Sequence, residues 1–345
     1  MKCPNCQNNQ KYKDGMICNM CKYHFALNPK EKYGMSDQGF KALLDKLSGA
    51  GQFYYTYNQL YAQVYRAIRK KHHPGFLGLS CAGIFLTIIA YSVLVGAFGL
   101  GWQYPAAFFF VFMIFAFILN RRSFKLGYDV PGRIIETYKI IHPLENLADG
   151  TKFKHLDKTS LDAEFFKYAP ERILITEHDD MADMLLLNRF HFDNKTLVVS
   201  AQKYPYAAFE ACQGFLANHP DIPVLLIHDC SDAGLKMQGK LLTDKSWNLE
   251  GRNINNLGLH PKDVDKLKSP VWIPYDKDKT ILLQGAAHEN IEQGFKMPLD
   301  IAPPSSMIGT LGIAMAAGLA LLSDDLLAMQ RENAGGMDSF GGGFG

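Results

Sequence analysis

Residues 173–200 read ILITEHDDMADMLLLNRFHFDNKTLVVS, in which a short apolar run precedes a helical pattern and a second apolar run. The first run, 173–176, has the length of a buried strand, and so does the second, 197–200. Apolar residues recur at helical spacing between them, so we expect a helix from Asp180 to Phe190. A strand, a helix and a strand in this order form one unit of a parallel sheet.

The same alternation continues toward the C-terminus. We expect a helix over 207–218, a strand over 223–227, a helix over 234–242 and a fourth strand over 253–257. Strands that alternate with helices imply an α/β fold, in which a parallel sheet carries helices on both faces. We place this domain at 170–285.

Three acidic residues follow the predicted strands at the points where the strands end. Glu177 directly follows the first strand, and Asp229 and Asp232 follow the third. In parallel sheets the working residues lie just beyond the C-terminal ends of the strands. Carboxylate oxygens are the ligands that Mg²⁺ prefers, so the three residues are candidate Mg²⁺ ligands and candidate catalytic residues for metal-assisted phosphoryl transfer. The alternative is that Asp229 and Asp232 only cap the helix that follows them.

Four of the seven cysteines lie in the first 21 residues, as the pairs Cys3 with Cys6 and Cys18 with Cys21. Each Cys-x-x-Cys turn directs two thiolates to one point, and two such turns complete a tetrahedral zinc site. All four ligands are cysteines, so we expect a structural zinc ribbon over 1–30, in a reducing compartment. A redox dithiol pair and an iron site of the same shape are the alternatives.

Two amphipathic helices are predicted over 36–72. Ser36 can cap the first helix, and Gly49-Ala50-Gly51 ends it. Thr56 and Gln59 form a capping box at the start of the second helix. The pattern fits a pair of helices that leads to a membrane, and it also fits half of a DNA-binding winged helix.

Residues Pro74 to Asn120 contain no Asp, Glu, Lys or Arg. The segments 75–100 and 104–120 are each long enough to cross, or nearly cross, a bilayer core of ~30 Å, so we predict a two-helix transmembrane hairpin over 75–120. Lysines and arginines flank the hairpin on both sides, which places the zinc ribbon and the α/β domain in the cytosol, at the inner membrane. No ionisable residue lies near the middle of the hairpin, which argues against a transporter or channel.

The remaining segments complete the predicted organisation. A helical linker over 121–169 joins the hairpin to the sheet, and a C-terminal segment over 286–330 follows the sheet. In that segment the apolar run 307–322 is short for a membrane span, and we expect a packed helix that does not cross. The end of the chain, 331–345, is a Gly-rich tail of low complexity. The net charge of +2 excludes a strongly basic protein that coats DNA.

Four segments of the α/β region resemble the Toprim domain, in the form found in the A subunit of topoisomerase VI and in the related meiotic double-strand-break proteins. They are 173–181, 197–200, 223–229 and 256–263, and the last of them contains Leu-Gly-Leu-x-Pro-x-Asp. The resemblance covers about residues 170–270. It implies that Glu177 corresponds to the metal-binding Glu of the family, and Asp229 to the first Asp of its Asp-x-Asp pair.

The chain departs from this family at two positions. The second Asp of the pair corresponds to Ser231, and Asp232 replaces it only if the loop shifts by one residue. A weaker resemblance of residues 58–62 to the family's winged helix puts the DNA-cleaving tyrosine at Ala62, next to Tyr61. A covalent phosphotyrosyl link requires a phenol, so the departures argue against DNA strand cleavage. The zinc ribbon, hairpin and divergent Toprim-like domain together also resemble uncharacterised bacterial membrane proteins.

These patterns predict a membrane-anchored protein whose cytosolic Toprim-like domain binds nucleic acid, a nucleotide or another phosphate ligand with Mg²⁺ and is catalytically degenerate. The alternative is a non-enzymatic membrane scaffold or regulator that recruits protein partners through the zinc ribbon and the tail. A metal site requires the carboxylates of Glu177, Asp229 and Asp232 to converge to roughly 4–6 Å.

Overall fold

The computed structural model describes residues 1–72, 88–89, 110–111, 114, 126–127, 129–155, 170–267, 270–274 and 286–317. The predicted transmembrane hairpin over 75–120 lies outside these ranges, apart from five residues, and so does the predicted tail over 331–345. Within the described ranges, no helix has both the length and the apolar character that a bilayer crossing requires.

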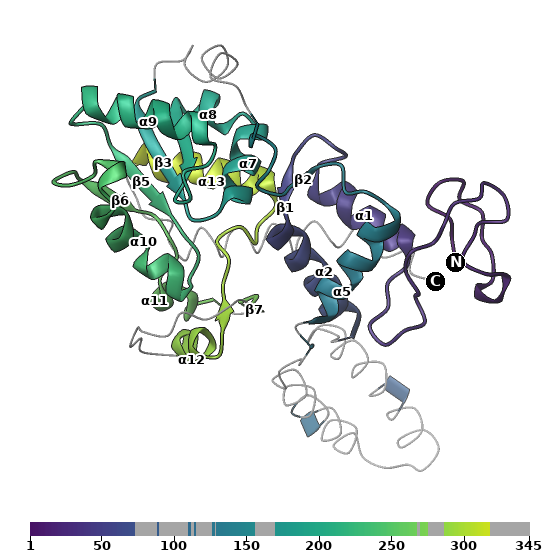
Figure 1. Ribbon diagram of the computed structural model, residues 1–345. Coiled ribbons are helices and arrows are strands. Elements are labelled where there is room, and N and C mark those ends of the chain that lie inside the picture. Colours follow the sequence, from purple (N-terminus) through teal and green to yellow (C-terminus); the bar gives the residue numbers. More distant parts are fainter. Residues whose placement is uncertain are drawn as a thin grey trace.

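A four-stranded sheet forms the centre of the C-terminal part (Figure 1). Its strands are β3 (Arg172–Thr176), β4 (Thr196–Ser200), β5 (Val224–Ile227) and β6 (Ile254–Asn256), in the order β4-β3-β5-β6. All three pairings are parallel, as predicted. Leu174 pairs with Val198 on one side and with Leu225 on the other, and every residue of β4 and β5 is buried. The apolar runs therefore form strands that are covered on both faces.

Helices connect these strands, as the alternating pattern predicted. They are α7 (Asp179–Leu187), α8 (Phe190–Asp193), α9 (Tyr206–Asn218) and α10 (Asp232–Thr243). Helix α11 (Pro261–Val264) follows the last strand, β6. From β3 the chain moves to one edge of the sheet and then returns past β3 to β5 and β6. With right-handed crossovers, this order puts α7 on one face and α9 and α10 on the other.

The predicted helix from Asp180 to Phe190 is interrupted in the structure. Arg189 has a φ of 60°, in the left-handed region, and separates α7 from α8. The Asn188 side chain donates to the Met184 carbonyl over 2.7 Å and also to the Tyr54 carbonyl over 2.9 Å. The interruption therefore ties the end of α7 to the N-terminal half of the protein.

The segment after the sheet returns to it. Strand β7 (Ile273–Pro274) pairs antiparallel with β8 (Phe295–Lys296), and α12 (Ala286–Glu292) lies between them in the sequence. The last described helix is α13 (Pro304–Ala317), whose Met315 carbonyl accepts a hydrogen bond of 3.3 Å from Arg172 of β3. Met307 and Leu311 are buried, so the described part of the predicted helix over 307–322 packs against the fold. The predicted boundary at 285 thus divides two segments that lie together.

Two helices lie over the predicted range 36–72, as expected: α1 (Asp37–Leu47) and α2 (Tyr57–His72). Ser36 caps α1 by accepting from the Gly39 amide over 3.2 Å. The capping box of α2 is also confirmed, because Thr56 and Gln59 each bind the other's backbone amide through their side chains. Helix α5 (Asp129–Ile141) packs against α2 and forms part of the predicted linker.

Two short parallel strands connect the segment before α2 with the segment after α5. Strand β1 (Tyr55–Thr56) pairs with β2 (Leu147–Ala148). Buried residues from α1, α2, α5, the large sheet and α13 form one continuous core. The N-terminal residues 1–25, which we call the cysteine module, have a separate small core around Cys3, Cys18 and Phe25.

Candidate metal sites

Glu177 and Asp229 lie side by side at the rim of the sheet, as predicted. Glu177 directly follows β3, and Asp229 lies two residues beyond the end of β5. Because β3 and β5 are paired in parallel, their C-terminal ends meet at the same edge. The Asp229 amide donates to Glu177 Oε2 over 2.7 Å, which fixes the two residues relative to each other.

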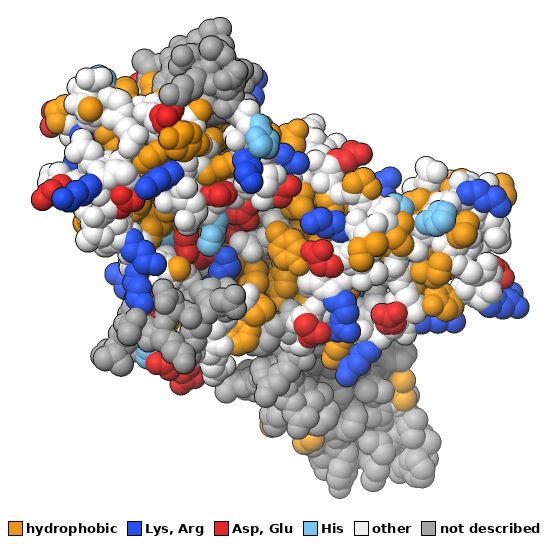
Figure 2. All heavy atoms as spheres, in the orientation of Figure 1, with side chains coloured by type: hydrophobic (Ala, Val, Ile, Leu, Met, Phe, Trp, Pro, Cys, Tyr) orange, Lys and Arg blue, Asp and Glu red, His pale blue; other side chains and the backbone are white. Residues whose placement is uncertain are grey.

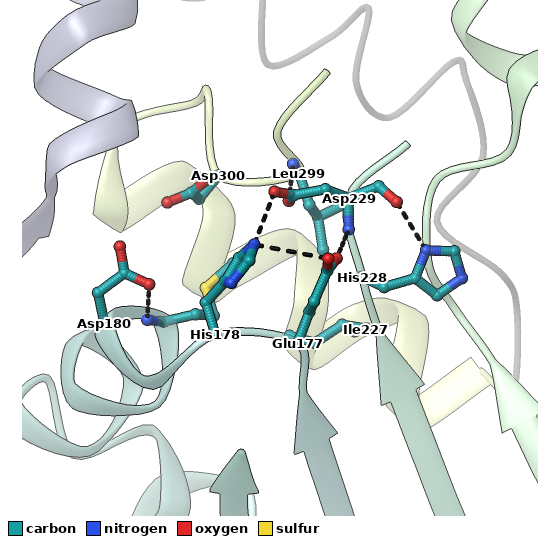
Figure 3. Close-up of a pocket in the computed structure, with 9 residues that line it drawn as sticks. Glu177, His178, Asp180, Ile227, His228, Asp229, Leu299 and Asp300 are labelled. Carbon is teal, nitrogen blue, oxygen red and sulfur yellow. Dashed lines mark hydrogen bonds and ion pairs between the residues drawn. The ribbon is translucent and has the colours of Figure 1, made fainter. Parts of the chain in front are cut away.

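The two carboxylates converge on a histidine that the sequence analysis gave no role. His178 Nε2 lies 3.2 Å from Asp229 Oδ2 and 3.6 Å from Glu177 Oε1. Figure 3 marks both contacts with dashed lines. Among the described residues, Glu177, His178 and Asp229 each offer one ligand atom within 4.8 Å of the others, so this group can hold a metal ion. The His178 side chain is 38% exposed and gives the cluster a route to solvent. Its position next to Glu177 is the signal that could have found it.

Asp232 is not part of this converging group. It lies in the first turn of α10 and forms an ion pair of 2.8 Å with Lys236. The N-cap of α10 is Ser231, whose Oγ accepts from the Gly234 amide over 2.9 Å and lies 3.2 Å from Glu177 Oε1. Ser231 therefore caps α10, and the alternative in which Asp229 and Asp232 cap this helix is wrong.

A lysine from a distant part of the chain completes the cluster. Lys296 Nζ lies 2.8 Å from Asp229 Oδ2 and 3.1 Å from His178 Nε2. On the opposite oxygen, Asp229 Oδ1 accepts from the Leu299 amide over 2.9 Å. No local sequence pattern marks Lys296, and the sequence analysis missed it.

The charges of the cluster shift each other's pKa values. Burial and the negative charge of Asp229 raise the pKa of Glu177. Burial also disfavours the Asp229 carboxylate, but Lys296 and His178 outweigh it and hold the pKa of Asp229 well below its usual range. Burial lowers the pKa of His178, yet the hydrogen bond and charge of Asp229 raise it overall to about 9. Nearby positive charge thus stabilises the Asp229 carboxylate, whereas burial and Asp229 disfavour the charged form of Glu177.

The cluster borders a cavity of about 10 Å³, which is the size of one water molecule or one metal ion. Asp180 and Asp300 also line it (Figure 3). Burial and the negative charges of Asp229 and Asp180 raise the pKa of Asp300 to about 7. Burial likewise raises the pKa of Asp180. Four carboxyl groups around an ion-sized space make this edge of the sheet suitable for a cation.

Two glycines allow the cluster to pack. A Cβ atom on Gly234 would lie 2.4 Å from the Asp229 carbonyl and 2.7 Å from Glu177 Oε2. A Cβ atom on Gly258 would lie 2.3 Å from the His228 ring. Gly258 belongs to the Leu-Gly-Leu segment quoted above, so close packing against His228 is the physical reason for glycine there.

The four N-terminal cysteines form the second candidate site. The Sγ atoms of Cys3 and Cys21 lie 3.5 Å apart, and those of Cys6 and Cys18 lie 3.6 Å apart. A tetrahedral site with Zn–S bonds of about 2.3 Å has S–S edges of about 3.8 Å. Hydrogen bonds from backbone amides, that of Cys21 foremost, lower the pKa of Cys18 to about 6. The cysteines are therefore positioned to bind a metal ion, and the spacing fits zinc.

The cysteine module is fixed to the helices behind it. Tyr23 stacks on His142 with ring centroids 4.5 Å apart, and its hydroxyl donates to Asp37 Oδ2 over 3.0 Å. The same carboxylate accepts from the amides of Ala26 and Leu27, each over 2.8 Å. Asp37 is buried and connects the module to the first turn of α1.

Comparisons of the chain with protein-family models, with curated proteins and with solved structures find no match. The Toprim resemblance accordingly remains a prediction from the sequence.

Proposed function

We propose that this protein is membrane-anchored and that its Toprim-like domain binds a divalent cation at the Glu177–His178–Asp229 cluster. Through that cation it binds a phosphate-bearing ligand, either nucleic acid or a nucleotide. The observation that carries the proposal is the convergence of Glu177 and Asp229 at the ends of two adjacent parallel strands. The membrane anchor is proposed from the uncharged run Pro74 to Asn120 and its basic flanks.

The side chains fit a metal of a particular kind. Two carboxylates suit Mg²⁺ or Mn²⁺, and an imidazole in the same set favours Mn²⁺ or another transition metal over Mg²⁺. When bound, such an ion would supply positive charge to a phosphate group. Glu177 and Asp229 would hold it by carboxylate oxygens, and His178 by Nε2.

A phosphate ligand would need that ion because the visible surface offers no continuous basic stripe. Figure 2 shows lysine and arginine side chains interspersed with acidic ones over the face it presents. Lys203 and Lys236, two of the cations near the middle of the domain, already pair with Asp244 and Asp232. A dense row of unpaired cations is what metal-free binding to a phosphate backbone requires.

The proposed function does not include DNA cleavage by a tyrosine at the position of the family's nucleophile. Ala62 stands where the family has its nucleophile, and the neighbouring Tyr61 is 2% exposed. A phenol buried in the core has no access to a phosphodiester. We therefore assign the domain a binding role, with structural zinc in the cysteine module.

Mn²⁺ titration of the full-length chain in detergent, with its zinc in place, tests the proposed function. We expect Glu177→Gln to weaken Mn²⁺ binding by more than about tenfold, because even outer-sphere changes weaken metal binding by about 10–100-fold. Asp232→Asn is the matched control, since it removes a buried acid of the same rim outside the cluster. Equal affinities of Glu177→Gln and the wild type would contradict the metal site, as would an equal loss in the control.

The phosphate ligand is tested in a second step. A short fluorescent oligonucleotide and a fluorescent nucleotide are each titrated with the protein, in the presence and absence of Mn²⁺. We expect Mn²⁺-dependent binding of at least one of them, and loss of that dependence in Glu177→Gln. Binding that ignores both Mn²⁺ and the substitution would place the ligand elsewhere on the protein.

A further inference from the structure

Lys296 occupies the position in the cluster that a bound cation would take. Its Nζ contacts two of the three prospective ligand atoms, at 2.8 Å from Asp229 Oδ2 and 3.1 Å from His178 Nε2. Its side chain is 12% exposed, so the ammonium is largely withdrawn from water. A buried ammonium is retained only with a close counter-charge, and Asp229 provides it.

The backbone after Lys296 is fastened to the same loop of the sheet. We call residues 297–302 the strap. Met297 forms a two-way backbone bridge with Cys230, with hydrogen bonds of 3.0 and 3.2 Å. The Leu299 amide then donates to Asp229 Oδ1. Lys296 and the strap therefore hold both oxygens of Asp229, which leaves this carboxylate little freedom to accept a metal.

The other end of the strap is held by α2 and the residue before it. Asp300 accepts hydrogen bonds from the Thr56 hydroxyl and from Asn58 Nδ2, the latter over 3.0 Å. The Ile301 carbonyl accepts from Arg66 over 2.9 Å, and the Ala302 carbonyl accepts from Gln59 over 2.8 Å. Helix α2 thus fixes the strap, and the strap fixes Lys296.

We propose that Lys296 is the resident cation of the cluster, that it competes with a divalent metal for Asp229 and His178, and that α2 sets this competition through the strap. The inference rests on the proposed function in one respect, because the metal concerned is that of the same cluster. A divalent ion gains access to Asp229 only when the Lys296 side chain withdraws. A metal ion binds only the molecules in which Lys296 has left the cluster. The apparent metal affinity of the wild type is therefore the intrinsic affinity multiplied by the fraction of such molecules.

Helix α2 is also the element that leads to the predicted hairpin, since it ends at His72. A change in the position of α2 would alter the contacts that Thr56 and Asn58 make with Asp300. The strap consequently offers a physical connection between the juxtamembrane helix and the metal cluster. The direction of the effect is fixed by the geometry, because loosening the strap frees Lys296 to leave.

Mn²⁺ affinity of the zinc-loaded, full-length chain in detergent tests this inference, with free Mn²⁺ measured by electron paramagnetic resonance. We expect Lys296→Met to bind Mn²⁺ about tenfold more tightly than the wild type or better, as for a competing state populated at about 90% or more. Asn58→Ala, which removes a strap contact without changing any charge, should also tighten binding. Lys236→Met is the control, because it removes a lysine paired with an acid outside the cluster and should leave the affinity unchanged.

The outcomes separate the inference from the proposed function. If Lys296→Met and the wild type bind Mn²⁺ equally while Glu177→Gln binds less, the inference is wrong and the metal site stands. Equal tightening by Lys236→Met would reduce the result to a general charge effect and overturn the inference. If none of the variants binds Mn²⁺, the proposed metal function fails and the inference fails with it. Because Asn58→Ala leaves the cluster intact, it decides the strap's role even if Lys296→Met does not fold.

Discussion

Gly234 shows how closely α10 approaches the cluster. No side chain fits at this position, because its Cβ atom would contact the Asp229 carbonyl and Glu177 Oε2. Gly239 lies in the same helix with open space around it. The two glycines share one helix and differ in their surroundings, so the same substitution can be compared at both positions.

Replacing Gly234 with alanine should destabilise the protein by about 1–3 kcal/mol through overpacking. Gly239→Ala should instead stabilise it by about 0.5–1 kcal/mol, because alanine favours the helix and no atom lies in its way. Chemical unfolding of both variants measures the difference. A Gly234→Ala protein as stable as Gly239→Ala would show that the packing around Glu177 is looser than described.

Asp300 predicts a pH dependence of stability. Its pKa rises from an ordinary value of 3.8 to about 7, so the folded protein keeps a proton that the unfolded chain releases above about pH 4. Stability should therefore fall as the pH rises from about 4 to about 7. In Asp300→Asn this contribution is absent. As the pH rises across this range, the free energy of unfolding of the wild type should therefore fall by about 2–4 kcal/mol relative to that of the variant.

Denaturant unfolding of both proteins at several pH values measures this difference. The altered hydrogen bonds to Thr56 and Asn58 would shift the free energy of unfolding of the variant by the same amount at every pH. Two parallel stability curves would contradict the raised pKa of Asp300.

At the residue scale, the sequence predicts the part of the cluster that depends on strand ends. Glu177 and Asp229 follow apolar runs, and parallel strands bring such positions together. Lys296 lies 67 positions from Asp229 and belongs to no motif, so its place is set only by tertiary packing. Asp300 is unpredictable for the same reason, since its partners Thr56 and Asn58 lie in the N-terminal half.

At the scale of elements, the strands were predictable because each is a short apolar run covered on both faces. The interruption between α7 and α8 was not, because Asn188 is bound to Tyr54, 134 positions away. The capping box of Thr56 and Gln59 was predictable, because both residues lie within one turn. Local hydrogen bonds are visible in a sequence, and distant ones are not.

The cysteine module is the element with the clearest chemical test. Cys18→Ser should lower the zinc content from about one ion per chain to almost none, because a structural site needs all four ligands. Loss of the ion should also loosen the contact of Tyr23 with His142 and expose residues 1–36 to proteases. Elemental analysis and limited proteolysis measure the two effects.

Cys212→Ser is the control for this experiment. Cys212 is buried in α9, far from the module in sequence and outside the four-cysteine group. Its replacement should leave the zinc content unchanged. Full zinc content in Cys18→Ser would mean that another residue supplies the fourth ligand.

At the scale of the whole molecule, the continuous core has a topological consequence. Helices α2 and α5 belong to the same core, although the predicted hairpin lies between them in the sequence. A chain that leaves a folded unit and returns to it crosses a bilayer an even number of times. The two predicted crossings agree with this requirement. The requirement follows from the shared core alone and makes no use of the basic residues that flank the hairpin.

Cysteine labelling tests the requirement directly. Lys70 of α2 and Lys139 of α5 are both exposed, and each is replaced singly by cysteine. A membrane-impermeant maleimide applied to intact cells, and then to permeabilised cells, should treat both positions alike, with the unsubstituted chain as background. Labelling of one position outside and the other only after permeabilisation would separate α2 from α5 and contradict the shared core.

The pairing of β1 with β2 also sets an order of events during synthesis. The Asn146 side chain binds the carbonyl of Phe53, which was translated 93 positions earlier. At about 5–20 residues per second, this interval takes about 5–20 s. The N-terminal half of the core cannot close before this interval ends, and by then the uncharged run Pro74 to Asn120 has been translated. We therefore expect the predicted membrane insertion to begin before the core closes, in a nascent chain in which the cluster at the sheet rim does not yet exist.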